Sequence, residues 1–150
     1  SSPLLLVFSE RKLLEQKDMS EKLQSIFPAS KKIFCSTAGE IDNRHVNENT
    51  AVCSLMHFEK TKTDFSIGNI GDHKNSYELG KKTASALDQK DLKYILVISD
   101  GSLINGDELV EGIQSAIEPG VIISGGLAGD GARFEKLNIP FSSFSFSYNL

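Results

Sequence analysis

The chain has 150 residues, a formal charge of -4 and 39% hydrophobic residues, which is ordinary usage for a globular protein. No apolar run is long enough to cross a bilayer, and the first one, Leu4–Phe8, lacks the flanks of a secretion signal. A nucleic-acid site would need a basic stripe, and the sequence has none. We therefore expect one domain over residues 1–150, without nucleic-acid or membrane partners.

The cysteine content indicates the compartment. Cys35 and Cys53 are the two cysteines, and both lie in apolar runs typical of strands. Secreted domains of this size that depend on disulfides usually carry more. The sequence therefore predicts a reducing, cytoplasmic location.

The charge is unevenly distributed along the chain. Residues 94–132 contain no lysine or arginine but six acidic residues, so this segment alone sums to −6. Such a segment repels phosphates and favours a ligand that bears an amine.

The first half of the chain predicts strands and helices in alternation. Residues 4–8 form an aliphatic strand, and residues 10–27 have helical spacing, with Ser9 as N-cap and Pro28 as stop. Further strands are expected over 31–36 and 51–59, with 62–67 as hairpin partner of the latter. A helix is then expected from Asn75 or Ser76 to about Leu87.

The second half predicts a strand–helix–strand unit. Residues 94–98 form a strand buried on both faces, and Asn105 caps a helix whose third residue, Glu108, completes a capping box. Residues 121–123 form the next strand, which stops at residues 124–126, and residues 141–148 alternate Phe with Ser like a strand. The fold class is therefore α/β, with a mixed, mostly parallel sheet of about five to seven strands flanked by helices.

Three predicted loops follow aliphatic strands and share one chemistry. Residues 35–40, 99–102 and 124–131 each combine glycine with a hydroxyl and a carboxylate. Ligands of open α/β sheets bind at the carboxyl ends of strands, so the three loops predict a pocket for a small polar ligand. The alternative is that the glycines make tight turns and the acids cap them. The spacing fits neither a dinucleotide fingerprint nor a P-loop, and no His or Cys pair has metal spacing, so we expect no cofactor and no metal.

For two residues, the sequence leaves both a catalytic and a structural interpretation open. Cys35 precedes amides that could form an oxyanion hole, but a strand-end thiol is more simply a core residue. Asp100 fits either a ligand-binding or general-base role or a cap of its own loop.

The three loops, in this order, resemble the N-terminal domain of the FIST family (F-box and intracellular signal transduction proteins). The resemblance is carried by CSTAGEI at 35–41, SDGSLINGDELVEGI at 99–113 and SGGLAGDGARFEK at 124–136. It implies a sensory domain rather than an enzyme, binding a small ligand such as an amino acid. By position it implies these ligand contacts, with no catalytic residue: Ser36, Thr37, Gly39, Glu40, Asp100, Gly101, Asn105, Gly125, Gly126, Gly129 and Asp130.

The same resemblance implies partners in a longer chain. We expect a companion C-terminal FIST domain and a signalling or F-box module that receives the signal. The chain begins without Met inside its first expected strand, so we expect it to be a fragment. Two other functions stay open: a protein-interaction scaffold of a ubiquitin-ligase or signalling complex, and an acyl- or amido-transfer enzyme that depends on Cys35.

Overall fold

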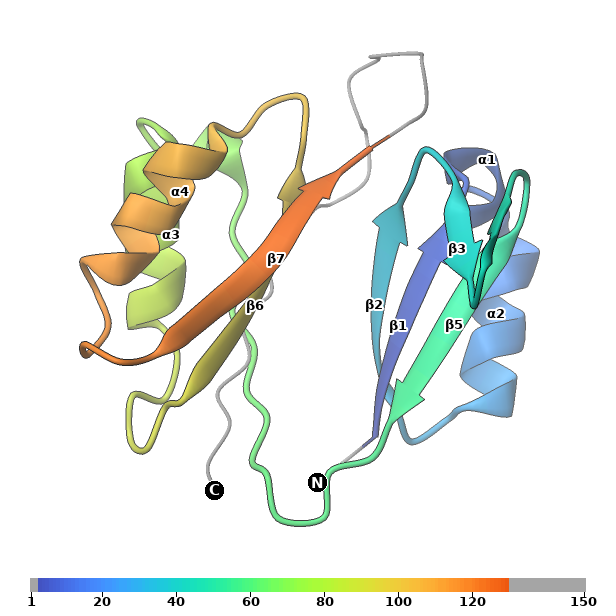
Figure 1. Ribbon diagram of the computed structural model, residues 1–150, viewed down its shortest axis with the longest axis horizontal. Helices are drawn as coiled ribbons and strands as arrows, with labels where there is room; N and C mark the ends of the chain where they lie inside the picture. Colours follow the sequence, from blue (N-terminus) through green and yellow to red (C-terminus); the bar gives the residue numbers. More distant parts are fainter. Residues whose placement is uncertain (1–2, 130–150) are drawn as a thin grey trace. The chain divides into compact units, whose positions relative to one another are not determined.

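A computed structural model of the chain describes residues 3–129, which form helices and strands of an α/β protein (Figure 1). The described residues divide into two compact units. The first unit contains residues 3–59 and Gly129, and the second contains residues 60–128. Each unit is described by itself below.

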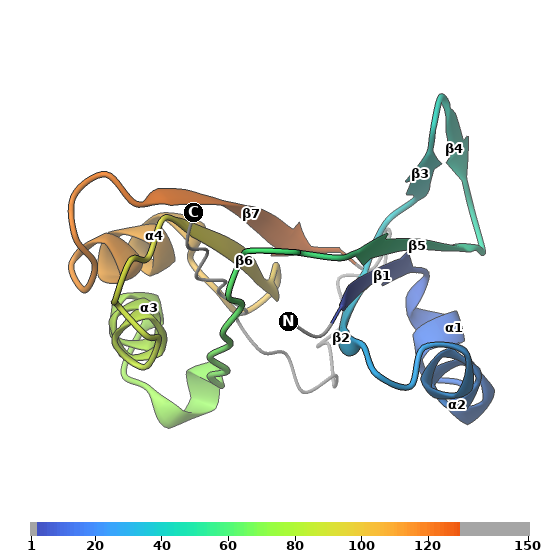
Figure 2. The same cartoon turned by 90° about the horizontal axis from the view of Figure 1, so that it is seen from below.

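The first unit is built on a three-stranded sheet with the order β2-β1-β5. β1 pairs with β2 in parallel and with β5 in the antiparallel direction. Two helices connect β1 to β2, and Figure 2 shows both on one face of this sheet, with the β3–β4 hairpin on the other side. The elements are β1 (Leu4–Ser9), α1 (Arg11–Leu14), α2 (Lys17–Ile26), β2 (Lys31–Ser36), β3 (Glu40–Asp42), β4 (His45–Asn47) and β5 (Ala51–Met56).

The predicted single helix over residues 10–27 is wrong, because the segment forms two helices. The chain leaves the helical conformation at Gln16, whose ψ is 120°, and α2 begins at Lys17. No glycine or proline marks the break, so the apolar spacing gave no sign of it. Ser9 is not the N-cap either: it is the last residue of β1, and its hydroxyl donates to the Thr50 carbonyl oxygen at 2.9 Å. The expected end near Pro28 is confirmed.

The second unit contains the predicted strand–helix–strand motif. β6 and β7 pair in parallel over seven residues, and α4 connects them. α3 and α4 lie together on one face of this pair (Figure 2). Aliphatic side chains from both helices and from β6 form a core, including Leu79, Ile95, Leu109 and Ile113. The elements are η1 (Ile70–Asp72), α3 (Ser76–Ser85), β6 (Tyr94–Asp100), α4 (Gly106–Gln114) and β7 (Ile122–Ala128).

Two glycines bring α3 and α4 into backbone contact. A Cβ atom on Gly80 would lie 2.3 Å from the Leu109 carbonyl oxygen, and one on Gly112 would lie 2.1 Å from the Tyr77 carbonyl oxygen. Neither position has space for a methyl group, so the absence of these two side chains sets how closely the helices approach.

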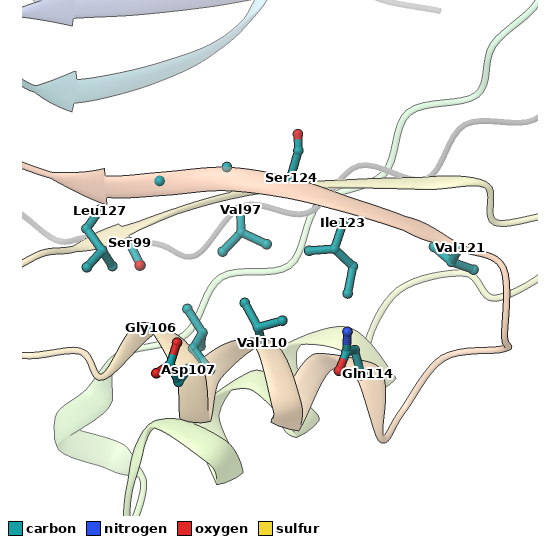
Figure 3. A pocket seen from close by; sticks show the side chains of 13 residues that line it. Val97, Ser99, Gly106, Asp107, Val110, Gln114, Val121, Ile123, Ser124 and Leu127 are labelled. Atoms are coloured by element: carbon teal, nitrogen blue, oxygen red, sulfur yellow. The ribbon is translucent and has the colours of Figure 1, made fainter.

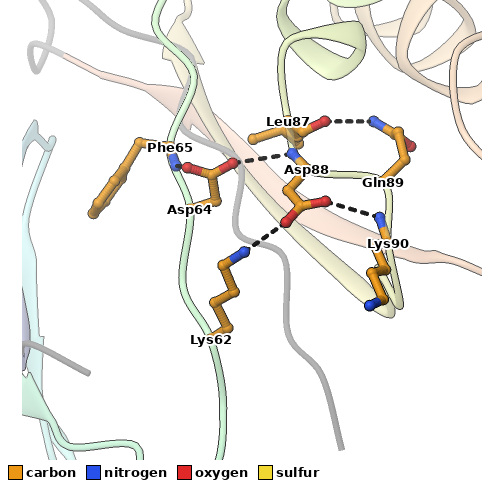
Figure 4. A network of polar contacts seen from close by, with 7 residues as sticks. All are labelled: Lys62, Asp64, Phe65, Leu87, Asp88, Gln89 and Lys90. Carbon is orange, nitrogen blue, oxygen red and sulfur yellow. Dashed lines mark hydrogen bonds and ion pairs between the residues drawn. The ribbon is translucent and has the colours of Figure 1, made fainter.

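The predicted hairpin partner over residues 62–67 is not a strand. The segment is extended, and Asp64 attaches it to the loop after α3 (Figure 4). The Asp64 carboxylate accepts the N–H of Phe65 at 2.9 Å and the N–H of Asp88 at 3.0 Å. Lys62 forms an ion pair with the Asp88 carboxylate at 2.5 Å. Asp64 and Lys62 therefore bind the segment to the loop after α3, and the segment does not pair with β5 as a strand.

β7 is longer than predicted. Residues 124–126 were expected to end the strand, but they pair with residues 96–98 of β6, and the ladder continues to Ala128. Their glycines do not interrupt it, because a parallel ladder uses only backbone groups.

The expected single sheet is not observed in residues 3–129. Their strands form three small sheets of three, two and two strands, with two parallel and two antiparallel pairings. The α/β class is confirmed at this coarser level. The strand predicted over 141–148 lies outside the described residues.

Candidate functional site

A buried carboxylate lies just after the end of β2. Glu40, the first residue of β3, is 1% exposed. The Thr37 hydroxyl donates to its Oε1 at 2.7 Å, and the Thr50 hydroxyl donates to its Oε2 at 2.9 Å, with the Thr50 N–H at 3.4 Å. Within residues 3–129, no lysine, arginine or histidine forms an ion pair with this carboxylate. The donors that hold it within the described part of the chain are therefore neutral.

Two serine hydroxyls are buried at the ends of the neighbouring parallel strands. Ser9 ends β1 and Ser36 ends β2, and both are 0% exposed. Among the described residues, the Ser36 hydroxyl has no hydrogen-bond partner. Because a buried hydroxyl without a partner is unfavourable, Ser36 offers a hydrogen-bonding group for a polar partner at the carboxyl end of β2.

The backbone at this strand end is held by hydrogen bonds within the first unit. The Thr37 N–H donates to the Ser9 carbonyl oxygen at 3.1 Å, and the Gly129 N–H donates to the Ser36 carbonyl oxygen at 3.2 Å. Gly39 has a φ of +156°, and a Cβ atom there would lie 3.3 Å from Val46 Cγ1, so the turn into β3 favours glycine. Predicted residues Ser36, Thr37, Gly39, Glu40 and Gly129 thus belong to one structural neighbourhood.

Cys35 does not have the surroundings of an activated nucleophile. Its side chain is buried, and its Sγ donates to the Ser36 carbonyl oxygen at 3.4 Å. Burial raises the pKa of the Cys35 thiol to about 11. Reactive cysteines are partly exposed and have lowered pKa values, because the thiolate is the nucleophile. The structure therefore supports the core interpretation of this residue.

The second predicted loop follows β6, in the second unit. Asp100 is buried, and its Oδ1 accepts the Ser102 N–H and hydroxyl, both at 2.6 Å, and the Leu103 N–H at 3.2 Å. This carboxylate oxygen therefore caps its own turn. Gly101 follows, and a Cβ atom there would lie 2.5 Å from the Ala128 carbonyl oxygen.

Asn105 caps α4, as predicted. Its Oδ1 accepts the N–H groups of Asp107 at 3.1 Å and of Glu108 at 3.2 Å. The reciprocal half of the capping box is not formed, because the Asn105 N–H donates to the Ser76 hydroxyl at 3.0 Å instead. The sequence pattern did not reveal this partner, which comes from the first residue of α3.

The third predicted loop is divided between elements. Gly125 and Gly126 lie within β7, in the second unit, whereas Gly129 follows the strand and belongs to the first unit. Asp130 lies outside the described residues. The sequence-predicted contacts therefore form two groups, one in each unit.

The sequence pattern did not reveal Thr50 and Ser9 as partners of this strand end. Thr50 reaches Glu40 because the β3–β4 hairpin returns the chain to the start of β5. The signal for that hairpin was present in the asparagines of residues 43–49, since Asn43 and Asn49 both have a φ of +56°. Turns of this kind favour asparagine.

Two further features are absent from residues 3–129. No group of three or more His, Cys, Asp or Glu side chains there is arranged to hold a metal ion. No helix there has both the length and the apolar character needed to span a membrane.

Comparison with known proteins gives one family. A search of curated proteins finds no match to this chain. The family model described as FIST N domain matches residues 3–146, nearly the whole sequence and all three loops on which the resemblance rests. The chain therefore belongs to the FIST N domain family, whose domain is associated with signal transduction.

Proposed function

We propose that this chain is a cytoplasmic sensory domain that binds a small polar ligand bearing an ammonium group, such as an amino acid. The observation that carries the proposal is the Glu40 carboxylate, which is buried without a cation from residues 3–129. Buried charges are normally paired, and a ligand ammonium is a counter-charge of the right sign. The cytoplasmic location of the chain is supported by the free thiols of Cys35 and Cys53.

The hydrogen-bonding capacity of the site supports the same ligand. A carboxylate has about four acceptor positions. Thr37 and Thr50 supply three donors to Glu40, which leaves one position on Oε1 for a ligand N–H. The Ser36 hydroxyl, which lacks a partner among the described residues, is the group we assign to the ligand's carboxylate.

Binding becomes a signal through differential affinity. Glu40 is almost fully covered, so ligand entry requires the turn that contains Thr37 and Gly39 to move. A ligand that binds one arrangement of this turn more tightly stabilises that arrangement. We propose that the change passes to a companion FIST domain and an attached signalling or F-box module.

A thermal-shift screen of this chain tests the proposal. The common amino acids and simple amines are the probes. A ligand present at one hundred times its dissociation constant should raise the free energy of unfolding by about 2.7 kcal/mol. Glu40→Gln should abolish the response, whereas Glu48→Gln, the same change at an exposed position, should retain it. The proposal fails if no probe stabilises the chain, or if Glu40→Gln responds like the parent.

A second candidate function, a protein-interaction module, is favoured by one apolar pair. Ile41 and Val46 lie opposite each other in the β3–β4 hairpin and are 70% and 72% exposed. Exposed apolar side chains that lie together are candidates for contact with another protein. If copies of the chain associate through this hairpin, sedimentation velocity should show concentration-dependent dimers, which Ile41→Lys abolishes.

A further inference from the structure

A hollow of about 430 Å³ lies between α4 and the β6–β7 pair, entirely within the second unit (Figure 3). Figure 3 shows Val97, Ile123 and Leu127 pointing from the strands toward α4, and Val110 pointing back from the helix. The volume lies within the range of small-molecule pockets, and the walls are mainly aliphatic, as in such pockets.

One position of β7 that lines the hollow cannot carry a side chain. Gly125 pairs with Val97, between Ile123 and Leu127 on the face toward α4. Its φ is +153°, and a Cβ atom there would lie 1.8 Å from the Val97 carbonyl oxygen. The backbone here therefore requires glycine, so β7 presents no side chain between Ile123 and Leu127.

A buried hydroxyl in the lining of the hollow has no hydrogen-bond partner among residues 3–129. Ser99 is 3% exposed, and among the described residues its Oγ accepts and donates no hydrogen bond. Figure 3 shows its side chain on the side of β6 that faces α4. Native proteins rarely leave such a group unsatisfied, so this second observation points to a polar partner inside the hollow.

The charge of the lining restricts the kind of partner. Asp107 and Gln114 are the polar side chains that α4 contributes, and no lysine, arginine or histidine of residues 3–129 lines the hollow. Residues 94–132 contain no lysine or arginine at all. An anionic molecule would therefore be repelled, whereas a neutral molecule or an amine is accepted.

We propose that this hollow is a second binding site, for a small molecule with an apolar body and one neutral or amine polar group. The apolar body lies against Val97 and Ile123, and the polar group hydrogen-bonds to Ser99. Val110 and Leu127, which are 37% and 50% exposed, are the side chains that turn aside to admit it. The site goes beyond the ligand proposed for Glu40, which lies in the other unit.

Three probes of similar shape and different charge test this site. Indole is neutral, tryptamine carries an amine and indole-3-acetate carries a carboxylate. Indole and tryptamine should shift the amide NMR signals of Gly125, Gly126 and Val110 in a saturable manner, and indole-3-acetate should not. The proposal is overturned if none of the probes gives saturable shifts at these residues, or if the anion binds as tightly as the amine.

Matched variants separate binding in the hollow from binding elsewhere. Val110→Phe fills the hollow and should weaken indole binding roughly tenfold or more. Glu111→Phe places the same ring on an exposed position of α4 outside the lining and should leave binding unchanged. Equal affinity of Val110→Phe and Glu111→Phe for indole would overturn the assignment.

A third variant keeps the test decisive if Val110→Phe fails to fold. Ser99→Ala removes only the hydroxyl, so it should weaken tryptamine binding roughly three- to tenfold while leaving the chain at least as stable as the parent. Unchanged tryptamine affinity would contradict the proposed role of Ser99. All these measurements leave Glu40 intact, so their failure is distinguishable from failure of the amino-acid proposal.

Discussion

At the start of α4, one asparagine satisfies two backbone groups, and its own N–H is satisfied by another helix. Asn105 accepts from Asp107 and Glu108, and its N–H donates to the Ser76 hydroxyl. The cap was readable from sequence, because a cap and its helix are neighbours in the chain. The Ser76 contact was not, because it joins residues that are distant in the chain.

Removal of this cap has a predictable cost. Asn105→Ala should lower the free energy of unfolding by about 1 kcal/mol, because two N–H groups of the first turn lose their acceptor. Urea denaturation measures the change. Asn105→Asp keeps an acceptor at the same position and should remain within a few tenths of a kcal/mol of the parent. Equal losses in both variants would contradict the capping role.

The two cysteines should differ in reactivity. Cys35 is buried and burial raises its pKa to about 11, so roughly one thiol in a thousand is ionised at pH 8. Cys53 is exposed, although partial burial also raises the pKa of its thiol. Iodoacetamide at pH 8 should therefore label Cys53 in the folded chain and Cys35 only after unfolding, as peptide mass mapping would show. Fast labelling of Cys35 in the native chain would contradict its assignment as a core thiol.

The raised pKa of Cys35 also gives stability a defined pH dependence. The thiol ionises more readily in the unfolded chain, where its pKa has the ordinary value of 9.0, than in the folded chain, where its pKa is about 11. The stabilisation is thus complete below about pH 9 and is lost as the pH rises through 11. Cys35→Ala should lose less stability than the parent between pH 8 and pH 11, measured by urea denaturation at each pH. An identical loss of unfolding free energy at alkaline pH in both proteins would contradict this role of Cys35.

At the scale of elements, the contact between α3 and α4 reverses the usual effect of replacing a helical glycine with alanine. Glycine to alanine inside a helix normally stabilises by about 1 kcal/mol. Gly112→Ala should instead destabilise by about 1–3 kcal/mol, because its Cβ would lie 2.1 Å from the Tyr77 carbonyl oxygen and force the helices apart. Gly106→Ala is the matched control, since its Cβ would be 3.8 Å from Leu127 Cδ1. Thermal unfolding should place the two variants on opposite sides of the parent, and a stabilised Gly112→Ala would contradict the packing described.

Local sequence signals predicted most elements but not all their bounds. The aliphatic runs of β1 and β6 and the Asn caps of α3 and α4 were readable, because burial and capping leave a pattern in adjacent residues. The continuation of β7 through Gly125 and Gly126 was not readable. Glycines usually suggest a turn, and only the pairing with β6 shows that they are strand residues.

At the scale of the whole molecule, the second unit has a hydrophobic core of its own. The core cluster built by Leu79, Ile95, Leu109 and their neighbours lies entirely within residues 60–128. We therefore expect a fragment of residues 60–128 to unfold cooperatively on its own, with the circular dichroism of helix and strand. A gradual, non-cooperative thermal transition of that fragment would show that this core is insufficient. The expectation that residues 1–150 form one domain stays a prediction.

The candidate site was predictable only where its residues are neighbours in the sequence. The turn with Ser36, Thr37 and Glu40 was identified from its composition, and these residues do lie at one strand end. Thr50 was missed, because it reaches Glu40 through the β3–β4 hairpin rather than through sequence proximity. The expected convergence of three loops was an inference from topology, and the third loop is largely strand.

The two missing side chains at Gly80 and Gly112 also have a mechanical consequence. Most packed helices have side chains between them, which can change rotamer and absorb a small displacement. Here carbonyl oxygens of one helix face the glycine Cα atoms of the other directly, so we expect α3 and α4 to move as one body. A molecule that displaces α4 from β7 should therefore also displace α3, including its first residues next to Asn75.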